Sequence, residues 1–312
     1  MDDAARAGYP GDGEAAPRED ECSRKAHDAR LTDPMRLIDV HFQGRERVIG
    51  CWQVGDVLID PGPETACATL VDALDGEPPR ALLLTHIHLD HAGATGTLVR
   101  RWPELEVYVH EIGAPHLADP AKLLQSAARL YGDDMDRLWG EVLPVPEANL
   151  RVLVGDETLA GGFRVAYTPG HASHHVAYLH DESGRAFVGD VAGVRIPPAD
   201  LTLPPTPPPD IDIDAWNASL SQIAEWDPDS LGITHFGAIE APFEQLAVMR
   251  DRLAAWATIA RELDGAAFEE HVRDEIAAGT PDEATAAEYL LAVPPEQQWL
   301  GLDRWWRKRA AA

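Results

Sequence analysis

The chain has 312 residues, with 26 Lys plus Arg against 53 Asp plus Glu, and its formal net charge is −27. A chain this acidic cannot in general neutralise phosphates, which argues against a duplex-binding protein and against binding to an anionic membrane surface. Hydrophobic residues make up 45% of the chain, so the acidity does not indicate disorder throughout. The length predicts one large domain, or a domain with an appendage.

The three cysteines, at positions 22, 51 and 67, are scattered and form no CxxC spacing. This argues against a disulfide framework and against a Cys-rich zinc site. We expect Cys51 and Cys67 to be small buried apolar residues. No segment approaches the ~20 apolar residues of a membrane span, and the N-terminus lacks an apolar signal core, so we expect a cytoplasmic protein.

Residues 1–34 are rich in Asp, Glu, Ala, Arg and Gly and contain hardly any large aliphatic residue. This composition predicts a disordered N-terminal tail. Periodic structure begins at Met35, which makes that methionine a candidate for the true start of the protein.

After Met35, short apolar runs alternate with helix-like stretches, and hairpin and crossover connections are mixed, which indicates layered α/β packing. The proline-rich stretch 204–214 is expected to be a stiff loop, because proline removes backbone donors. Strands are predicted at 36–42, 47–53, 56–60, 81–85, 106–110, 163–168, 175–180, 185–189 and 230–234. Helices are predicted at 64–75, 92–102, 114–118, 121–131, 134–140, 214–226 and 240–261.

The rest of the chain, 262–303, is predicted to form further short helices and ends in a small basic cluster at 304–309. We therefore predict three parts. These are the tail at 1–34, a main domain at 35–244, and a helical appendage at 245–312 that packs on the same domain.

The run RALLLTHIHLDHAG, at 80–93, carries the clearest chemical pattern. Its apolar part predicts a buried strand that delivers His86, His88, Asp90 and His91 at its C-terminal end. Residues two apart in an extended chain point to the same side, so His86 and His88 can converge on one ion. Without a metal, each unsatisfied buried polar group would cost about 1–3 kcal/mol. The pattern therefore predicts a metal site.

This pattern resembles the HxHxDH signature of the metallo-β-lactamase-fold hydrolase superfamily, and four further elements occur in the order found there. They are a DPG turn at 60–62, TPGH at 168–171, GD at 189–190 and the His-bearing strand end at 234–236. The resemblance covers about 35–240 and is nearest to a branch of uncharacterised stand-alone hydrolases. It implies an α/β fold, the metallo-β-lactamase-like αβ/βα four-layer sandwich, here with a C-terminal helical appendage.

Carried over position by position, the resemblance implies two divalent metal ions. Zn is the first choice, and Fe and Mn also suit such ligands. The first ion would be held by His86, His88 and His171, and the second by Asp90, His91 and His235, with Asp190 bridging. Asp90 would also be catalytic, by orienting the attacking hydroxide.

Some residues near the ligands have two interpretations. Asp60 is expected to accept a hydrogen bond from a ligand, with a turn-capping role as the alternative. His175 matches a family position that is usually not a ligand, and His174 departs from the family, where Gly is common. For both, orienting a ligand and plain strand packing are equal alternatives. For His110 we favour packing.

Candidate substrate contacts are weaker. Arg195 can meet an anionic group of a substrate, and a surface salt bridge is the equal alternative. Tyr131, Trp139 and the loop 204–210 can line the mouth of the site, although aromatic residues at helical spacing are more often part of a core.

The function implied is a metal-dependent hydrolase, binuclear, in which a metal-bound hydroxide cleaves a small-molecule ester, thioester, lactone or related bond. The alternatives are a mono-iron sulfur (persulfide) dioxygenase and a non-catalytic metal-binding protein. The positive charge of two divalent ions exceeds the negative charge of two aspartates and a hydroxide, so the predicted centre is net positive. The acidic surface is largely screened beyond ~8 Å, so an anionic small-molecule substrate is allowed. Nucleic acid and membrane are not expected partners, and a homodimer is left open.

Overall fold

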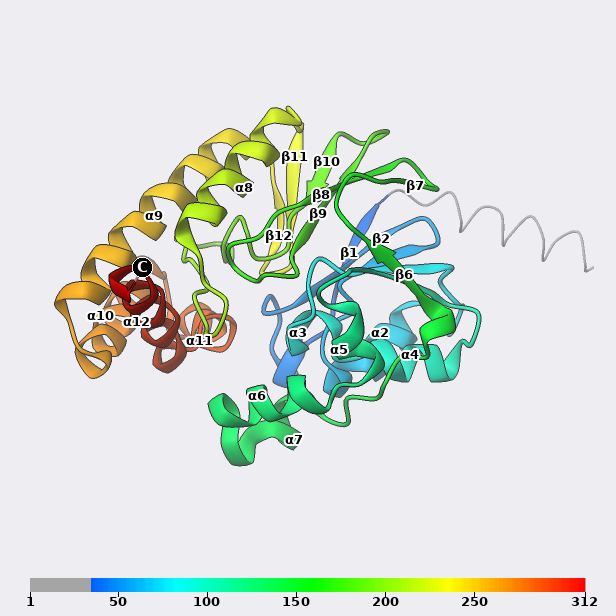
Figure 1. The fold of residues 1–312 in the computed structure, drawn as a ribbon, viewed down its shortest axis with the longest axis horizontal. Coiled ribbons are helices and arrows are strands. Elements are labelled where there is room, and N and C mark those ends of the chain that lie inside the picture. The colour runs from blue at the N-terminus through cyan, green and yellow to red at the C-terminus, as the bar shows by residue number, and fades with distance from the viewer. Residues whose placement is uncertain (1–34, 312) are drawn as a thin grey trace, which may run out of the picture. The chain divides into compact units, whose positions relative to one another are not determined.

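The computed structural model describes residues 35–311, so the predictions made for residues 1–34 lie outside the described part of the chain. Two six-stranded sheets form the centre of this part (Figure 1). The first contains, in spatial order, β1 (Arg36–Asp39), β2 (Gly50–Val54), β3 (Val57–Ile59), β4 (Ala81–Leu83), β5 (Glu106–His110) and β6 (Leu150–Leu153). The second runs from β12 (Gly237–Ile239) through β11 (Ser230–Ile233), β10 (Arg185–Phe187), β9 (Val176–His180) and β8 (Phe163–Tyr167) to β7 (Thr158–Leu159).

The sheets pack face to face, because their facing strands carry large apolar side chains. Trp52 and Leu83 from the first sheet meet Phe163, Tyr178 and Phe187 from the second in one buried cluster. Trp52 and Phe187 contact each other edge to face, with ring centroids 5.5 Å apart. This cluster holds the two halves of the sandwich together.

Helices cover the outer face of each sheet. The first sheet is covered by α2 (Cys67–Ala73), α3 (Leu89–Ala92), α4 (Thr95–Arg101), α5 (Ala114–Ala118), α6 (Ala121–Tyr131) and α7 (Met135–Trp139). The second is covered by α8 (Ile213–Glu225), α9 (Pro242–Glu262), α10 (Gly265–Gly279), α11 (Glu283–Ala292) and α12 (Pro295–Ala311). The order helix, sheet, sheet, helix confirms the predicted four-layer sandwich.

Strand direction explains why the metal motif gathers at one edge. β3, β4, β5 and β6 are parallel neighbours, and β10 is parallel to β11. Parallel strands bring their carboxyl ends to the same edge of a sheet, which is where ligands bind in α/β folds. Asp60 and His86 follow β3 and β4, whereas Asp190 and His235 follow β10 and β11.

Several predicted elements differ in detail. β6, β7 and β12 were not predicted; β7 and β12 have only two and three residues, too few to show a period. β6 lies at a sheet edge with Val152 55% exposed, so it lacks the alternation of a half-buried strand. The predicted helix at 92–102 is shorter, α4 at Thr95–Arg101, and a separate short helix, α3, precedes it at Leu89–Ala92. Cys51 and Cys67 are buried and free, as expected.

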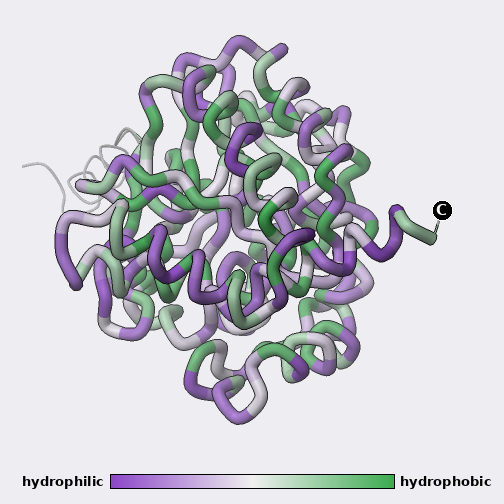
Figure 2. The backbone as a smooth tube through the Cα atoms, turned by 90° about the vertical axis from the view of Figure 1, so that its left-hand side faces the viewer, coloured by the Kyte–Doolittle hydropathy of each residue, from purple (hydrophilic) through white to green (hydrophobic). Residues whose placement is uncertain are grey.

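The helices after residue 244 share the core of the second sheet. Trp256, Phe268, Tyr289 and Leu302 belong to the same buried cluster as Leu231 of β11. Hydrophobic and hydrophilic stretches alternate along the chain (Figure 2), and no helix within residues 35–311 is long and apolar enough to cross a membrane.

Replacing Phe268 with Ala should lower the free energy of unfolding of the whole folded part by about 3–5 kcal/mol, because the ring is fully buried against Trp256. Urea denaturation should show one transition at a lower midpoint. The matched control is Phe243→Ala, whose ring is 50% exposed and whose loss should change little. Separate unfolding of the C-terminal helices before the sheets would contradict the shared core.

Candidate metal centre

Four segments at the sandwich edge supply the seven residues of the predicted site. The turn after β4 supplies His86 and His88, and α3 supplies Asp90 and His91. The loops after β8, β10 and β11 supply one residue each. Three overlapping groups have potential ligand atoms within 4.8 Å of one another: His86, His88 and His171; His86, His91 and Asp190; and Asp90, His91 and His235. The structure thus brings together every residue of the predicted ligand set.

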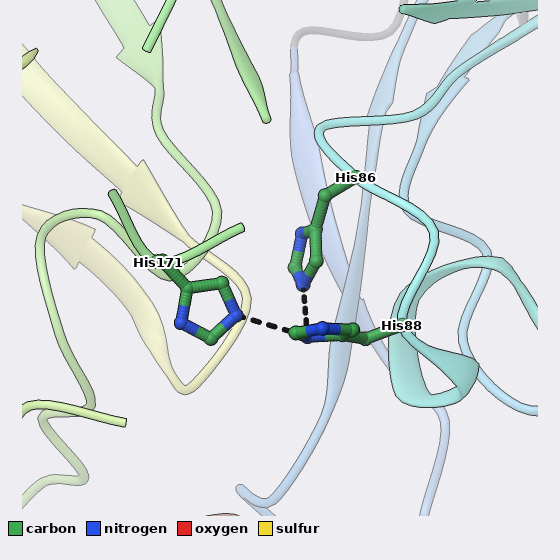
Figure 3. Close-up of side chains that lie close together, drawn as sticks. All are labelled: His86, His88 and His171. Carbon is green, nitrogen blue, oxygen red and sulfur yellow. Dashed lines mark hydrogen bonds between the residues drawn. The ribbon is translucent and has the colours of Figure 1, made fainter. Parts of the chain in front are cut away.

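In the first group three imidazole nitrogens meet (Figure 3). His88 Nδ1 lies 3.0 Å from His86 Nε2 and 2.9 Å from His171 Nε2. His88 comes from the first half of the sandwich together with His86, whereas His171 comes from the second half. The group therefore closes only when the two halves pack together.

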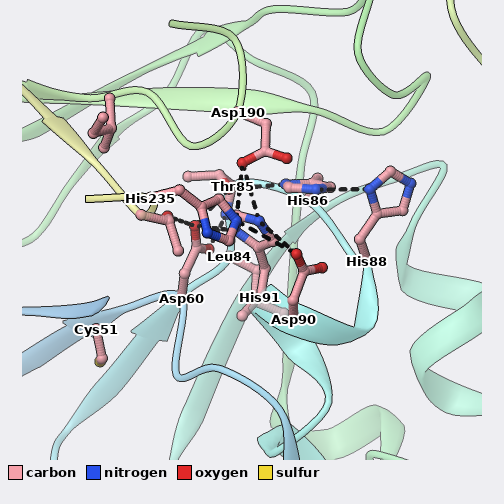
Figure 4. A network of polar contacts seen from close by, with 12 residues as sticks. Cys51, Asp60, Leu84, Thr85, His86, His88, Asp90, His91, Asp190 and His235 are labelled. Carbon is pink, nitrogen blue, oxygen red and sulfur yellow. Dashed lines mark hydrogen bonds and ion pairs between the residues drawn. The ribbon is translucent and has the colours of Figure 1, made fainter. Parts of the chain in front are cut away.

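The other two groups share His91 and contain the carboxylates, and we refer to them together as the second group (Figure 4). His91 Nε2 lies 3.1 Å from Asp190 Oδ1 and 3.7 Å from Asp90 Oδ2. His235 Nε2 lies 3.4 Å from Asp90 Oδ2. The other oxygen of Asp190, Oδ2, lies 3.3 Å from His171 Nε2 in the first group. Asp190 therefore faces both groups with different oxygens, which is the arrangement a bridging carboxylate needs.

The outward nitrogens of four imidazoles each contact an oxygen, which fixes the ring orientation. His86 Nδ1 lies 3.1 Å from Thr85 Oγ1, and His91 Nδ1 lies 2.8 Å from Asp60 Oδ2. A histidine that donates its outer N–H in this way presents its other nitrogen as an acceptor, the form that binds a metal. The remaining two contacts are His171 Nδ1 to Pro205 O, 2.9 Å, and His235 Nδ1 to Val48 O, 2.6 Å.

Asp60 lies directly behind the site with only 1% exposure. Its carboxylate accepts hydrogen bonds from the backbone N–H and hydroxyl of Thr85, at 2.8 and 2.7 Å, and from the hydroxyl of Thr234, at 3.1 Å. It also contacts His91. The structure therefore gives Asp60 the expected acceptor position, with contacts to strand ends of both sheets.

The two groups differ in the protonation of their side chains. Burial, together with the charge of His91, lowers the pKa of His86 well below its usual value, and burial and His171 lower that of His88 to about 4. Burial, although Asp190 opposes it, also lowers the pKa of His171. The first group therefore holds neutral imidazoles with free lone pairs at neutral pH.

In the second group the carboxylates dominate. Burial opposes the shift, yet Asp190 and Asp90 raise the pKa of His91 well above its usual value. Burial likewise opposes ionisation of Asp90, but His91 and His235 lower its pKa to about 2. The pKa of Asp190 lies well below its usual range, because His91 and His171 outweigh burial. Both aspartates are ionised at neutral pH.

The unsatisfied atoms show that these residues fit a metal. His91 Nε2, Asp190 Oδ1 and His235 Nε2 are buried and make no well-oriented hydrogen bond, although all three point into the centre and His91 Nε2 lies 3.1 Å from Asp190 Oδ1. Such buried atoms cost about 1–3 kcal/mol each unless something binds them. Imidazole and carboxylate donors with no thiolate suit Zn, Fe or Mn.

Gly189 allows this close packing. A Cβ on Gly189 would lie 2.5 Å from Thr85 Oγ1 and 2.9 Å from His175 Nε2, and its φ of +45° is unfavourable for other residues. His175 is fully buried, stacks on His86 with centroids 5.1 Å apart, and has its Nδ1 2.9 Å from Thr168 Oγ1. It therefore lies behind a predicted ligand without joining the three groups.

A cavity of about 470 Å³ opens from the centre. Its lining includes His88, Asp90 and Asp190 of the centre, together with Ser173, His174 and residues of the proline loop. The Nδ1 of His174 accepts a hydrogen bond from the Ile87 N–H at 3.4 Å, so its Nε2 carries the proton and can donate.

Only some of the predicted substrate contacts line the cavity. Tyr131 and Trp139 line it, and their rings contact each other edge to face, 4.9 Å apart. Arg195 does not line it: its guanidinium pairs with Asp200 and donates to Gln245, so the ion-pair alternative describes it. His110 stacks on Tyr167 with centroids 4.4 Å apart, in agreement with packing.

The C-terminal helix α12 supports one predicted ligand through the proline loop. The backbone N–H of Thr206 donates to Gln298 Oε1 at 2.5 Å, and its hydroxyl donates to the Gln298 carbonyl at 3.0 Å. The adjacent Pro205 carbonyl contacts His171. A Cβ on Gly301 would overlap the Thr206 carbonyl oxygen, so helix and loop are in close contact.

Sequence reasoning missed two kinds of residue here. Thr85 and Thr234 each immediately precede a predicted ligand at a strand end, and this repeated Thr-His pair was a usable signal. Gln298 had no such signal, because its role depends on how α12 packs against a distant loop.

The family model of the Metallo-beta-lactamase superfamily matches residues 55–235, more than half of the chain. The chain belongs to the metallo-β-lactamase superfamily. It is 30% identical over 197 residues to the Metallo-beta-lactamase fold-containing protein ST1585 of Sulfurisphaera tokodaii, covering 61% of this chain and 71% of that protein. A hydroxyacylglutathione hydrolase of Xanthomonas campestris is 34% identical over 138 residues, which are 43% of this chain and 40% of that enzyme. The expectation of a metallo-hydrolase of this superfamily is thereby confirmed.

Solved structures show the same fold. The crystal structure of ST1585 from Sulfolobus tokodaii superposes with a TM-score of 0.67 at 23% identity, covering 86% of this chain and 98% of that one. The metallo-beta-lactamase family protein TTHA1429 from Thermus thermophilus gives 0.63 at 20% identity, with 89% and 94% covered. Both cover more of this chain than the family model does.

Asp60→Asn should weaken metal binding by about 10–100-fold, because the variant removes the charge that orients His91. Competition with a chromophoric chelator measures this affinity. Asp251→Asn, on an exposed position of α9, is the matched control and should bind metal as the native protein does. Unchanged affinity in the Asp60 variant would show that the contact has no part in holding the site.

The metal-free protein should lose stability in acid partly through His174. Burial and the charge of His88 lower its pKa to about 3, against about 6.5 when unfolded. The unfolded chain therefore binds more protons between these values, and the free energy of unfolding falls as pH falls through that window. In His174→Gln the fall should be shallower by up to about 1.4 kcal/mol per pH unit.

Denaturant unfolding with chelator at several pH values between about 4 and 6.5 measures the slope. Equal slopes in the native protein and the variant would show that burial does not lower the pKa of His174.

Proposed function

We propose that this protein is a binuclear metal-dependent hydrolase that cleaves a small-molecule ester, thioester, lactone or related bond. The observation that supports it most is the position of Asp190, whose two oxygens face two separate groups of histidines. His86, His88 and His171 would hold one ion, and Asp90, His91 and His235 the other. Zn²⁺ is the proposed metal, since the donors are nitrogen and oxygen atoms.

When bound, two divalent ions would lower the pKa of a shared water toward ~7 and polarise a substrate oxygen. The chain's own residues do the rest. Asp90 lines the cavity, and because its pKa is about 2 it acts there as an acceptor that orients the attacking water. His174 lines the same cavity, and its N–H can donate to a substrate oxygen. Water adds to the acyl carbon, the bond to the leaving oxygen or sulfur breaks, and a proton of the water ends on the leaving group.

The relatives agree with this reaction class. Those named hydroxyacylglutathione hydrolase support hydrolysis of an acyl compound. The C-terminal helices that help to line the cavity lie beyond residues 55–235, the region that matches the superfamily, so the substrate itself is not transferred from these relatives.

His86→Ala and Asp190→Ala should each reduce bound metal and lower kcat/KM by more than the roughly 10–100-fold expected for losing an outer contact of a ligand. Elemental analysis of protein purified without chelators measures the first effect. A panel of ester, thioester, lactone and phosphodiester probes measures the second. His271→Ala should retain both.

Three outcomes would contradict the proposal. One iron per chain together with oxygen uptake on a persulfide would indicate a sulfur dioxygenase. Bound metal without turnover on any probe would indicate a non-catalytic metal-binding protein. Full activity in either site variant would show that the assigned residues are not the catalytic ones.

A further inference from the structure

A buried ion pair joins α11 to the loop that precedes β2. Glu288, on α11, is only 4% exposed, and its two carboxylate oxygens accept from the guanidinium of Arg47 at 2.9 and 3.3 Å. Two parallel N–H···O bonds fix the direction of both side chains as well as their distance. The pair therefore holds the loop against a helix that follows it by 241 positions in the chain.

The backbone of Arg47 is constrained as well. Its N–H donates to Asp39 Oδ2 at 2.7 Å, and its φ of +59° lies in the left-handed region, which is unfavourable for a residue other than glycine. Such a conformation persists where the surrounding structure enforces it. Asp39 supplies one contact from β1, and Glu288 supplies another from α11. The conformation of the loop thus depends in part on a C-terminal helix.

The residue after Arg47 contacts a predicted ligand. Val48 is fully buried, and its carbonyl accepts from His235 Nδ1 at 2.6 Å. The other ring nitrogen of His235, Nε2, faces Asp90 Oδ2 at 3.4 Å (Figure 4). The Val48 carbonyl therefore holds the ring with Nε2 toward the centre.

The packing of α11 brings Glu288 to this loop. Tyr289 and Val293 of this segment belong to the core of the second half of the sandwich, whereas Leu291 packs against the core of the first half. The helix thus contacts both halves, and the ion pair with Arg47 lies on the side of the first half.

The next helix, α12, has a corresponding relation to another ligand. Its Gln298 accepts from the Thr206 N–H, and the adjacent Pro205 carbonyl contacts His171. Both helices lie outside residues 55–235, the region that matches the superfamily. Each of the two helices therefore holds a loop whose carbonyl orients one ligand, and the two ligands belong to different ions of the proposed centre.

We propose that Glu288 is a positioning residue for the second ion, because through Arg47 and the Val48 carbonyl it sets the orientation of His235. This assignment rests on the ligand set of the proposed function and not on the reaction. Gln298 has the same relation to the first ion through His171. Since the two paths are separate, the loss of one should weaken one ion and leave the other. General stabilisation by the C-terminal helices would affect both ions together.

Two variants address the two paths. Glu288→Gln removes the charge that pairs with Arg47 at nearly the same side-chain size, and Gln298→Met removes the acceptor of the Thr206 N–H. Glu283→Gln is the matched control, because Glu283 is exposed at the start of the same α11. Arg47→Lys keeps a positive charge beside Glu288 but loses the two-bond geometry, so it tests the same path if Glu288→Gln does not fold. Thermal unfolding shows which variants are folded.

The orientation of each ligand can be observed without metal or catalysis. NMR of chelator-treated full-length protein with ¹⁵N-labelled histidine detects imidazole N–H groups, and buried hydrogen-bonded ones exchange slowly with water. His235→Ala and His171→Ala assign the two signals by their absence. Glu288→Gln and Arg47→Lys should lose the slowly exchanging His235 signal and retain that of His171. Gln298→Met should do the reverse, and Glu283→Gln should retain both.

Metal affinity gives a second measurement. Titration of the same proteins with ¹¹³Cd²⁺ should give one NMR signal for each occupied site, again assigned with His235→Ala and His171→Ala. Glu288→Gln should weaken the second site by about tenfold, the lower end of the effect of an outer contact of a ligand, and leave the first site unchanged.

The outcomes separate this proposal from the proposed function. A native His235 signal and native affinity of the second site in Glu288→Gln would overturn the positioning role and leave the hydrolase standing. Equal weakening of both sites would also overturn it. Selective loss at His235 in a protein that hydrolyses no probe would support the positioning role and contradict the hydrolase.

Discussion

A buried carboxylate, that of Asp60, is the contact on which the site depends. It follows the third strand of the first sheet, yet it accepts from Thr85 at the end of the fourth strand and from Thr234 at the end of a strand in the other sheet. Its remaining contact is with His91. An isolated buried charge is very costly, so this carboxylate is tolerable only where several donors surround it. The need to satisfy one charge thus sets the relative positions of three strand ends.

The ligands arranged around this carboxylate divide into two chemically unlike halves. One contains histidines that burial and mutual repulsion keep neutral, and the other contains histidines and aspartates that hold one another charged. In the protein without metal, ion pairs partly compensate the second group, whereas the first has only lone pairs facing one another. A cation therefore relieves repulsion in the first group and replaces protons in the second.

The motif residues could be predicted because their chemistry is local in sequence. His86, His88, Asp90 and His91 lie within six consecutive positions after an apolar strand, and this spacing does not depend on how distant parts of the chain pack. The layered α/β packing followed from strands and helices that were long enough to show a period, and the four-layer order from the resemblance to the superfamily. The short strands β7 and β12 were not, and the edge strand β6 exposes Val152. The role of Arg195 could not be predicted in this way. Whether its guanidinium contacts a substrate or Asp200 depends on the conformation of a loop, which residue spacing does not determine.

The contribution of the C-terminal helices to the cavity could not be predicted either, for a similar reason. Leu291 and Gln298 are far from the metal motif in sequence, and both have ordinary neighbours for helix residues. Their roles arise because α11 and α12 pack across to the other half of the sandwich and to the proline loop. Periodicity predicts that such helices exist, but not which surface they cover.

The contact of α12 with the proline loop has a consequence for the order in which the site forms during synthesis. His171 emerges from the ribosome well before Gln298, and until then the loop that carries Pro205 lacks the helix that fixes it. The strand ends can assemble beforehand, but the carbonyl that orients His171 is fixed last. The nascent chain therefore contains all seven predicted ligands before the loop that orients His171 is fixed, and α12 supplies that last contact.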